Sequence, residues 1–239
     1  MKNPKGASPL LFNRYSIFMT PEAGMFADSG AAWLGWDLEK GCAVPHPKAS
    51  ETALRIATQA PRKYGFHGTI KPPFHLAKGT TYESLLSQTK ALCAVHAPVE
   101  IEALSLTIDK STLALTPEGN IDHLASLAAA VLQKLDHFRA PLSATELAGR
   151  RKANLTPLQE TNLKNWGYPY VLDAFKFHIT LSGHLPPKDL EHLKTLARTH
   201  FAHNLGRPMR FCSLILAGEA GDGRFHALHR LPLSGKIVP

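Results

Sequence analysis

The sequence predicts a mixed α+β fold made of two similar lobes. Segments of strand and helix character alternate along the whole chain, and the pentapeptide Phe-His-x-Thr-[Ile/Leu] occurs at residues 66–70 and again at 177–181. Each copy is followed by a Pro-Pro pair, a predicted helix and a pair of predicted strands. We therefore expect a single domain over residues 1–239, with two pseudo-symmetric lobes at approximately 50–120 and 170–239.

Proline and polar capping residues delimit the elements of the first half. Pro21 stops the first apolar strand, Ser50 is placed to cap a helix that Pro61 closes, and Pro72-Pro73 ends the first motif strand. We expect a strand over 10–19, an irregular segment rich in Gly, Pro and Trp over 22–48, a helix over 50–60, a strand over 64–71, a helix over 81–97 and two strands within 99–115.

The second half has a similar order. Pro141 and Pro157 interrupt its helical stretches, and a Gly-Asp-Gly turn separates its last two strands. We expect helices over 121–138, 143–166 (broken at Pro157) and 187–204, and strands over 175–182, 209–217 and 224–233.

The composition excludes several classes of protein. Hydrophobic residues make up 44% of the chain and charged residues 19%, which is ordinary globular usage. No apolar run approaches the roughly 18 residues of a membrane span, and no apolar signal core follows the N-terminal lysines. Cys42, Cys93 and Cys212 form no C-x-x-C pair, which indicates reduced thiols in a cytoplasmic protein.

The chain is basic, with 27 Lys and Arg against 19 Asp and Glu and a net charge of +8. This balance favours an anionic partner such as nucleic acid, a nucleotide or a small phosphate ester. No run of five basic residues is present, so we expect no nucleic-acid-binding tail. A basic surface that serves solubility alone remains the alternative interpretation.

The two repeated motifs carry the chemistry. Side chains alternate between the faces of a strand, so His67, Thr69 and Lys71 are predicted to share one face, opposite the apolar residues of the motif. In the second copy the corresponding polar row is Lys176, His178, Thr180 and Ser182.

One such motif is unremarkable on a half-exposed strand, but two in matching contexts predict a shared cleft. Two imidazoles can then act as general base and general acid, and threonine hydroxyls can donate to phosphoryl oxygens. This chemistry requires neither metal nor cofactor, and we expect none.

Several other residues are weaker candidates for substrate binding. Lys71 and Ser182 extend the two polar rows, Arg14 and Tyr15 lie on a strand expected beside the motif strands, and Tyr168 precedes the second motif. Edge packing or a solvated strand end is the alternative for each of them. Arg150, Arg151 and Lys152 form a short basic cluster between two helices, for which a solvated face is favoured and a binding role is the alternative.

No metal or nucleotide motif accompanies the repeats. The sequence has no H-E-x-x-H, C-x-x-C or aspartate cluster, no G-x-x-x-x-G-K-[ST] phosphate loop and no Rossmann fingerprint. Triphosphate hydrolysis and dinucleotide binding are therefore disfavoured.

The two H-x-T motifs resemble those of the 2H phosphoesterase superfamily, in particular its "phosphonate metabolism protein" subfamily, which is encoded beside C–P lyase genes. Matching segments cover nearly the whole chain, whereas residues 99–117 depart from the pattern. The segments that carry the resemblance are Arg14-Tyr15, Ala32-Trp33-Leu34-Gly35, 64–74, Leu155-Thr156-Pro157, 166–171, 177–181 and His229-Arg230.

The resemblance implies a bilobal, pseudo-twofold fold in which two antiparallel sheets form a central cleft with helices outside. It also implies that His67 and His178 are catalytic and that Thr69 and Thr180 bind phosphate. The reaction expected from it is metal-independent hydrolysis of a small cyclic phosphodiester, either ribose 1,2-cyclic or nucleoside 2′,3′-cyclic phosphate, in phosphonate catabolism. The residues do not assign which histidine is the base.

Two other functions remain open. An RNA-end-processing 2H enzyme would need a basic, aromatic-lined track for several nucleotides, and a non-catalytic phosphate-ligand binder would be stabilised by ligand without turnover. We expect a small phosphorylated ribose or nucleotide as partner, with RNA less favoured, no membrane, and a monomeric chain.

Overall fold

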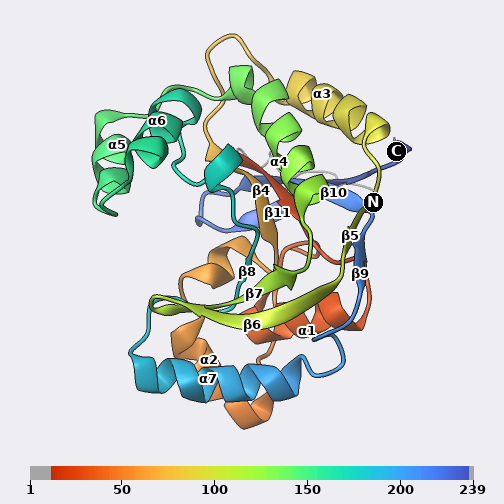
Figure 1. Ribbon diagram of the computed structural model, residues 1–239, viewed down its shortest axis with the longest axis vertical. Helices are drawn as coiled ribbons and strands as arrows, with labels where there is room; N and C mark the ends of the chain where they lie inside the picture. The colour runs from red at the N-terminus through yellow and green to blue at the C-terminus, as the bar shows by residue number, and fades with distance from the viewer. Residues whose placement is uncertain (1–11, 237–239) are drawn as a thin grey trace, which may run out of the picture.

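A seven-stranded antiparallel sheet forms the centre of the protein (Figure 1). The computed structural model describes residues 12–236, so the first two residues of the strand expected over 10–19 lie outside the described part. The strand order is β11-β10-β1-β4-β8-β7-β6, and every neighbouring pair is antiparallel. The strands are β1 Tyr15–Met19, β4 Gly68–Phe74, β6 Ala103–Asp109, β7 Thr112–Glu118, β8 Ile179–Thr180, β10 Ser213–Glu219 and β11 Phe225–Pro232.

Two small antiparallel ladders accompany this sheet, β2 (Trp36–Asp37) with β3 (Cys42–Ala43), and β5 (Val99–Ile101) with β9 (Met209–Phe211). The predicted α+β class with antiparallel strands is confirmed. No helix within residues 12–236 is long and apolar enough to cross a membrane.

The helices lie on the two ends of the sheet. Helices α3 and α4 pack against β10, β11 and β4 at the top of Figure 1, and α7 packs against β6 and β7 at the bottom. Thr81, Ser143 and Thr156 each cap a helix by accepting a hydrogen bond from a backbone N–H of its first turn. The helices are α1 Met25–Leu34, α2 Glu51–Ala57, α3 Tyr82–Val95, α4 Asp122–Lys134, α5 Ala144–Arg151, α6 Pro157–Trp166 and α7 Pro187–His200.

Each half of the sheet contains strands from both halves of the chain. The β6–β7 hairpin, which follows the first motif, pairs with β8 of the second motif. The β10–β11 hairpin, which follows the second motif, pairs with β1 beside β4. The sheet halves therefore do not correspond to the ranges 50–120 and 170–239 that the repeat predicts. A repeat in sequence fixes the order of elements, but a crossover connection decides which strand edge each hairpin joins.

The two faces of the sheet differ in depth of burial. One face carries the main core, in which Ile17, Ile70 and Ile179 of the sheet pack with apolar residues of α3, α4 and α7. The opposite face carries a small second cluster of Phe18, Leu38, Ile215, Ala217 and Phe225. We call this second side the open face.

The segment over 22–48, which we expected to be irregular, contains helix α1. Within α1 the only helix breaker is Gly30, and a Cβ there would lie 2.1 Å from the ring of Phe66, so the glycine permits a close helix–chain approach. Trp33 is fully buried and its Nε1 donates to the carbonyl of Leu181 at 2.9 Å. Contacts with distant segments therefore stabilise α1, and the content of Gly and Trp in the sequence does not reveal these contacts.

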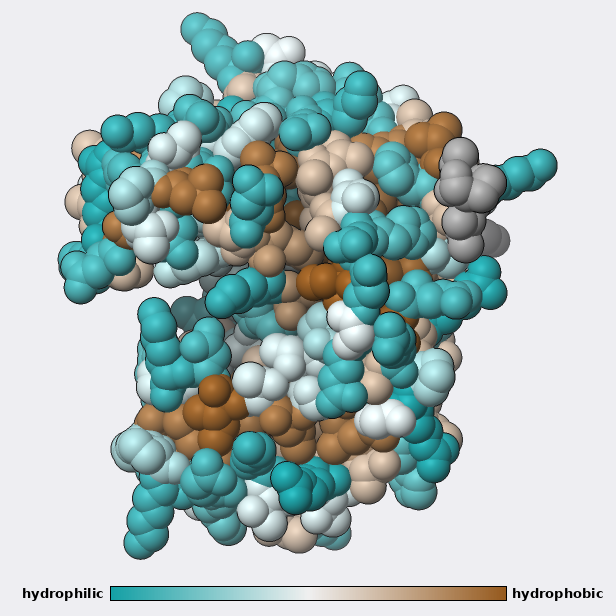
Figure 2. Space-filling model, viewed as in Figure 1, coloured by the Kyte–Doolittle hydropathy of each residue, from teal (hydrophilic) through white to brown (hydrophobic). Residues whose placement is uncertain are grey.

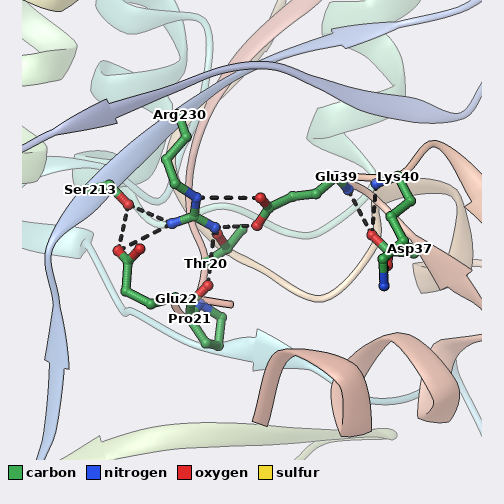
Figure 3. Close-up of polar contacts among 8 residues, drawn as sticks. All are labelled: Thr20, Pro21, Glu22, Asp37, Glu39, Lys40, Ser213 and Arg230. Atoms are coloured by element: carbon green, nitrogen blue, oxygen red, sulfur yellow. Dashed lines mark hydrogen bonds and ion pairs between the residues drawn. The ribbon is translucent and has the colours of Figure 1, made fainter. Parts of the chain in front are cut away.

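Arg230 of β11 holds the β2–β3 hairpin against the sheet (Figure 3). Its guanidinium pairs with Glu22 and Glu39 and donates to Thr20 Oγ1 at 2.7 Å. Asp37 Oδ1 in turn accepts from the backbone N–H groups of Glu39 and Lys40, both at 2.9 Å. The β2–β3 segment is thereby fixed as a wall of the open face.

The strand boundaries differ from those predicted around the motifs. β4 begins at Gly68 because Gly65 adopts a left-handed φ of 74° and turns the chain first. The strand continues through Pro72-Pro73, which is tolerated because β4 pairs with β8 only at Gly68 and leaves that edge open beyond it. The region over 99–118 forms three strands rather than two, and the second motif strand is reduced to β8.

Candidate active site

The two motifs meet where β4 pairs with β8. Gly68 lies opposite Ile179, and this is the single pair that joins the two halves of the sheet. Continuing this antiparallel register by one residue sets His67 opposite Thr180 and Thr69 opposite His178. Side chains directly opposite on one face have Cβ atoms roughly 5 Å apart. The four motif side chains therefore share one small area of the open face.

Close packing explains why the central residue of the first motif is a glycine. A Cβ at Gly68 would lie 2.2 Å from the ring of Phe177, which is 2% exposed. Ile179, its partner across the ladder, is fully buried in the main core. The motif strands thus pack with no room between them, and the His and Thr side chains are directed to the other face.

Both motif histidines are oriented by the same hydrogen bond. Nδ1 of His67 lies 2.9 Å from the carbonyl oxygen of Gly65, and Nδ1 of His178 lies 2.8 Å from that of Lys176. A carbonyl only accepts, so Nδ1 carries the proton in each ring and Nε2 is left for chemistry. Nε2 of His67 lies 3.1 Å from Oγ1 of Thr69.

The surroundings of the two imidazoles are unequal. His67 packs against Phe18, with ring centroids 3.7 Å apart, and against Tyr64 at 6.0 Å. Burial lowers the pKa of His67 to about 4, the hydrogen bond to Gly65 opposes this, and the nearby His178 lowers it further. His178 is exposed. The two motif histidines therefore differ in burial, and His67 is neutral at pH 7.

Arg14 and Tyr168, two of the predicted substrate-binding residues, lie in one polar cluster. Arg14 forms a bidentate pair with Glu219, both bonds at 2.6 Å, and its guanidinium lies near Tyr64. The ring of Tyr168 packs against the guanidinium of Arg150, whose Cζ lies 5.0 Å from the ring centroid. We call Arg14, Tyr64, Arg150 and Tyr168 the arginine–tyrosine cluster.

The expected orientation of Lys71 toward the cleft is wrong. Thr69 pairs with Phe18, whereas Lys71 pairs with Ile17, so a bulge inserts one residue between them and reverses the alternation. Lys71 is 1% exposed on the core side, where its Nζ lies 3.3 Å from Oδ1 of Asp136. Burial lowers the pKa of Lys71 to about 8, against the raising effect of Asp136.

Tyr15 and Ser182 also lie away from the open face. Tyr15 is in β1, which does pair with β4, but its side chain stacks on Tyr82 in the main core, with centroids 5.7 Å apart. Ser182 is 1% exposed, and its hydroxyl donates to the carbonyl of Gly183 and accepts from the N–H of Leu113. Neither side chain can reach a ligand between the histidines.

Three residues of the site escape the sequence analysis. Phe18 was missed because it has the pattern of an ordinary strand residue. Tyr64 was missed because alternation places it on the apolar face of the motif strand. Arg150 was missed because a basic cluster of this kind is typical of a solvated face. The turn at Gly65 separates Tyr64 from the strand, so strand alternation does not apply to it. A glycine between a tyrosine and the motif is the one local signal of this turn.

Within residues 12–236, no three His, Cys, Asp or Glu side chains gather closely enough to hold a metal ion. Cys42, Cys93 and Cys212 are free thiols.

A comparison with protein families places most of the chain in one family. A family model described as "Protein of unknown function (DUF1045)" matches residues 69–226, which is more than half of the chain. The chain belongs to the DUF1045 family. The matched region of this DUF1045 protein begins at Thr69 and includes all of the second motif.

Two curated relatives share the printed name "Ribose 1,5-bisphosphate phosphokinase PhnN". The protein of Janthinobacterium sp. (strain Marseille) is 34% identical over 232 residues, covering 93% of the DUF1045 chain and 51% of the relative. That of Laribacter hongkongensis (strain HLHK9) is 32% identical over 215 residues, covering 87% and 49%. The DUF1045 chain thus spans about half the length of these curated relatives.

Solved structures show only a distant likeness. The protein TT0787 of Thermus thermophilus gives a TM-score of 0.45 at 14% identity, over 93% of this chain and 99% of that one. Usb1 of Kluyveromyces marxianus gives a TM-score of 0.38 at 11% identity, over 92% and 98%.

Proposed function

We propose that this DUF1045 protein is a phosphodiesterase of the 2H type, which opens a small cyclic phosphodiester without a metal ion. The observation that carries the proposal is the shared face of the two motifs. Each imidazole has Nδ1 bound to a backbone carbonyl two residues earlier, which leaves Nε2 free, and Nε2 of His67 lies 3.1 Å from Oγ1 of Thr69. This is the arrangement that general acid–base catalysis at phosphorus requires.

In the proposed reaction His67 is the general base. Its pKa near 4 keeps Nε2 unprotonated at neutral pH, so it can take a proton from the attacking water. The water oxygen forms a bond to phosphorus while the bond from phosphorus to one ribose oxygen breaks. His178, in its protonated form, donates from Nε2 to that leaving oxygen. The product is a phosphate monoester with a free hydroxyl, and the proton returns from His67 to His178 through solvent.

Thr69 and Thr180 complete the site in this proposal. Their hydroxyls donate hydrogen bonds to the two non-bridging oxygens, on which negative charge accumulates as the bond to water forms. Because each threonine lies across the ladder from a histidine, each phosphoryl oxygen is held beside one of the proton-transfer groups.

The substrate we propose is a ribose 1,2-cyclic or nucleoside 2′,3′-cyclic phosphate, and phosphonate catabolism is the proposed setting. The printed names of both curated relatives refer to a kinase acting on ribose 1,5-bisphosphate. This chain has no G-x-x-x-x-G-K-[ST] loop, so we do not propose kinase activity for it. The phosphodiesterase we propose would act on the same substrate class, a ribose phosphate, as the kinase in the name of these relatives, of which this chain matches about half.

The test is turnover by EDTA-treated protein of ribose 1,2-cyclic phosphate and of 2′,3′-cyclic mononucleotides. His67→Ala and His178→Ala are run beside His123→Ala, an exposed histidine on α4 that serves as the control. We expect losses of about 10²–10⁴-fold in the first two variants and none in the control. Full activity in both motif variants would overturn the mechanism.

The same assay separates the other functions. Thermal stabilisation by these diesters without turnover would indicate a binder, and activity on short RNA but not on mononucleotides would indicate RNA-end processing. Gel filtration of the same preparation tests the proposed monomer.

A further inference from the structure

A pocket lies away from the motif residues, between α5, α6 and the segment over 139–142. Its volume is about 370 Å³, within the range of about 300–1,000 Å³ that is typical of small-molecule sites. Its lining combines apolar and cationic side chains, and among the described residues no acidic side chain lines it. The apolar side chains include Leu142, Leu147 and Leu163, and the cationic ones are Arg139, Arg151 and Lys164.

On the α6 side of the pocket, one carboxylate serves two cations. Oε1 of Glu160 lies 2.6 Å from Nη2 of Arg151 and 3.8 Å from Nζ of Lys164. A separation of 3.8 Å is too long for a hydrogen bond, so Glu160 leaves the three ammonium donors of Lys164 unused. The side chain of Lys164 is 64% exposed and can turn toward a ligand in the pocket.

The same shortage of carboxylates occurs around Arg139. Oδ1 of Asp136 lies 2.8 Å from Nε of Arg139 and 3.3 Å from Nζ of the buried Lys71. Arg139 also donates to the carbonyl of Asn165 at 3.1 Å, which ties this part of the lining to the end of α6. The two carboxylates, that of Asp136 and the one on α6, together serve four cations. This excess of positive charge favours an anionic ligand.

Helix α5 contains no buried residue. Leu147, the apolar side chain with which it lines the pocket, is only half-buried. Figure 2 shows apolar surface among hydrophilic side chains where α5 and α6 lie. A short helix with little buried apolar surface belongs to the least stable elements of a fold. A ligand with an apolar body would bury Leu147 and stabilise α5 against α6.

The pocket is separate from the arginine–tyrosine cluster. Arg150 belongs to that cluster and packs on the ring of Tyr168, whereas the next residue, Arg151, lines the pocket. Successive side chains of a helix point about 100° apart. The cluster and the pocket therefore use different sides of α5.

We propose that this pocket binds a small organic anion with an apolar body, and that the bound anion fixes α5 against α6. The anionic group pairs with Lys164 and Arg151, and the apolar body packs on Leu142, Leu147 and Leu163. The proposal does not depend on phosphodiesterase activity, because no residue of either motif lines the pocket.

The first experiment measures binding through the amide signals of NMR spectra. The probes are 4-phenylbutyrate, its neutral analogue 4-phenylbutan-1-ol, and acetate, which has the charge without the apolar body. We expect 4-phenylbutyrate to shift signals of α5 and α6 and to bind at least about tenfold more tightly than either analogue. Equal binding of the acid and the alcohol, or shifts that leave α5 and α6 unaffected, would overturn the proposal.

Charge variants give opposite expectations. Lys164→Gln should weaken binding of 4-phenylbutyrate about twofold to fivefold. Glu160→Gln should strengthen it by a similar factor, because it releases Arg151 and Lys164 from their shared carboxylate. Lys188→Gln, at an exposed position of α7, controls for net charge, and thermal unfolding checks the fold of each variant. Changes of the same sign in the Lys164 and Glu160 variants, or an equal change for the alcohol, would contradict the assigned contacts.

The second experiment measures hydrogen exchange of the backbone amides with and without saturating 4-phenylbutyrate. We expect exchange in α5 to slow about tenfold, since the ligand binds only the ordered helix. Exchange in α7, at the other end of the sheet, should change little (Figure 1). Binding that leaves exchange in α5 unchanged would overturn the claim that the ligand fixes this helix.

Discussion

The imidazole of His67 packs against the ring of Phe18 with a centroid distance of 3.7 Å. Phe18 is fully buried in β1, and its partner in the ladder is Thr69, so one aromatic side chain touches the first motif from the neighbouring strand. Burial, to which this contact contributes, lowers the pKa of His67 to about 4.

The pH dependence of catalysis should report this contact. Because His67 must be neutral to accept a proton, we expect the acid limb of kcat/KM on a cyclic diester near pH 4. Phe18→Leu removes part of the desolvation and should move the limb upward toward the ordinary histidine value of about 6.5. A wild-type limb already at about 6.5, unmoved by Phe18→Leu, would refute the assignment of His67 as base.

The stability of the protein should depend on pH through the same residue. The folded-state pKa of His67 is about 4, below its unfolded value of about 6.5, so the unfolded chain binds more protons between these values and stability rises with pH there. The full change is about 3 kcal/mol, present above about pH 6.5 and lost as pH falls toward 4. Urea unfolding of wild type and His67→Gln from pH 4 to 7 checks it, since the difference between the two proteins should show that rise; a constant difference would contradict it.

The threonine hydroxyls should matter for the chemical step rather than for folding. Thr69→Val and Thr180→Val keep side-chain shape and remove one donor each, so we expect kcat to fall about 10²–10³-fold with little change in KM. Thr195→Val on the exposed side of α7 is the control. Steady-state kinetics on a cyclic diester measures the effect, and wild-type kcat in both motif variants would exclude phosphoryl contacts by these hydroxyls.

The joint between the sheet halves should be sensitive to a single methyl group. Gly68→Ala places a Cβ 2.2 Å from the ring of Phe177, so the β4–β8 pair must separate, and we expect a loss of about 1–3 kcal/mol in unfolding free energy. Gly149→Ala in α5 meets no atom within 4 Å and should instead stabilise the protein by up to about 1 kcal/mol. Urea denaturation of both variants provides the comparison, and equal stabilities would argue against tight packing at the joint.

The buried pair of Lys71 and Asp136 should not affect substrate affinity, and the protein should be destabilised only when one partner is left without the other. Lys71→Met replaces a 1% exposed amine with an apolar side chain of similar length, and we expect unchanged KM and a nearly unchanged unfolding free energy. Asp136→Ala leaves the buried ammonium without its carboxylate and should cost about 3 kcal/mol or more. A raised KM in Lys71→Met would restore Lys71 as a ligand contact.

Local patterns in the sequence predicted much of the fold. The helices expected over 81–97 and 143–166 contain α3, α5 and α6, although the helix-capping role expected for Ser50 is wrong, since its side chain makes no cap hydrogen bond to α2. The pair of motifs was found from residue types alone, and the structure brings both to one sheet face. Helix α1 was missed because its burial depends on distant partners such as Phe66 and Leu181.

Strand alternation predicted the directions of individual side chains in the site less accurately than local patterns predicted the helices and strands. Alternation along a strand fails at one bulge, which moves Lys71 to the core, and at one glycine turn, which frees Tyr64 from the strand. The bulge has no period that a sequence pattern can reveal, because it is set by the register with a neighbouring strand, whereas the turn at Gly65 ends the alternation before β4 begins.

The sequence by itself determined the α+β class, the repeated motif and the type of side chain available for catalysis, since these depend on residues close together in the chain. The tertiary structure alone decided that β4 meets β8 at Gly68, that burial lowers the pKa of His67, and that the guanidinium of Arg150 packs on the ring of Tyr168. Each of these depends on which distant segments exclude water from which groups. Burial and long-range register are properties of the whole packed chain, so they arise only once it has folded.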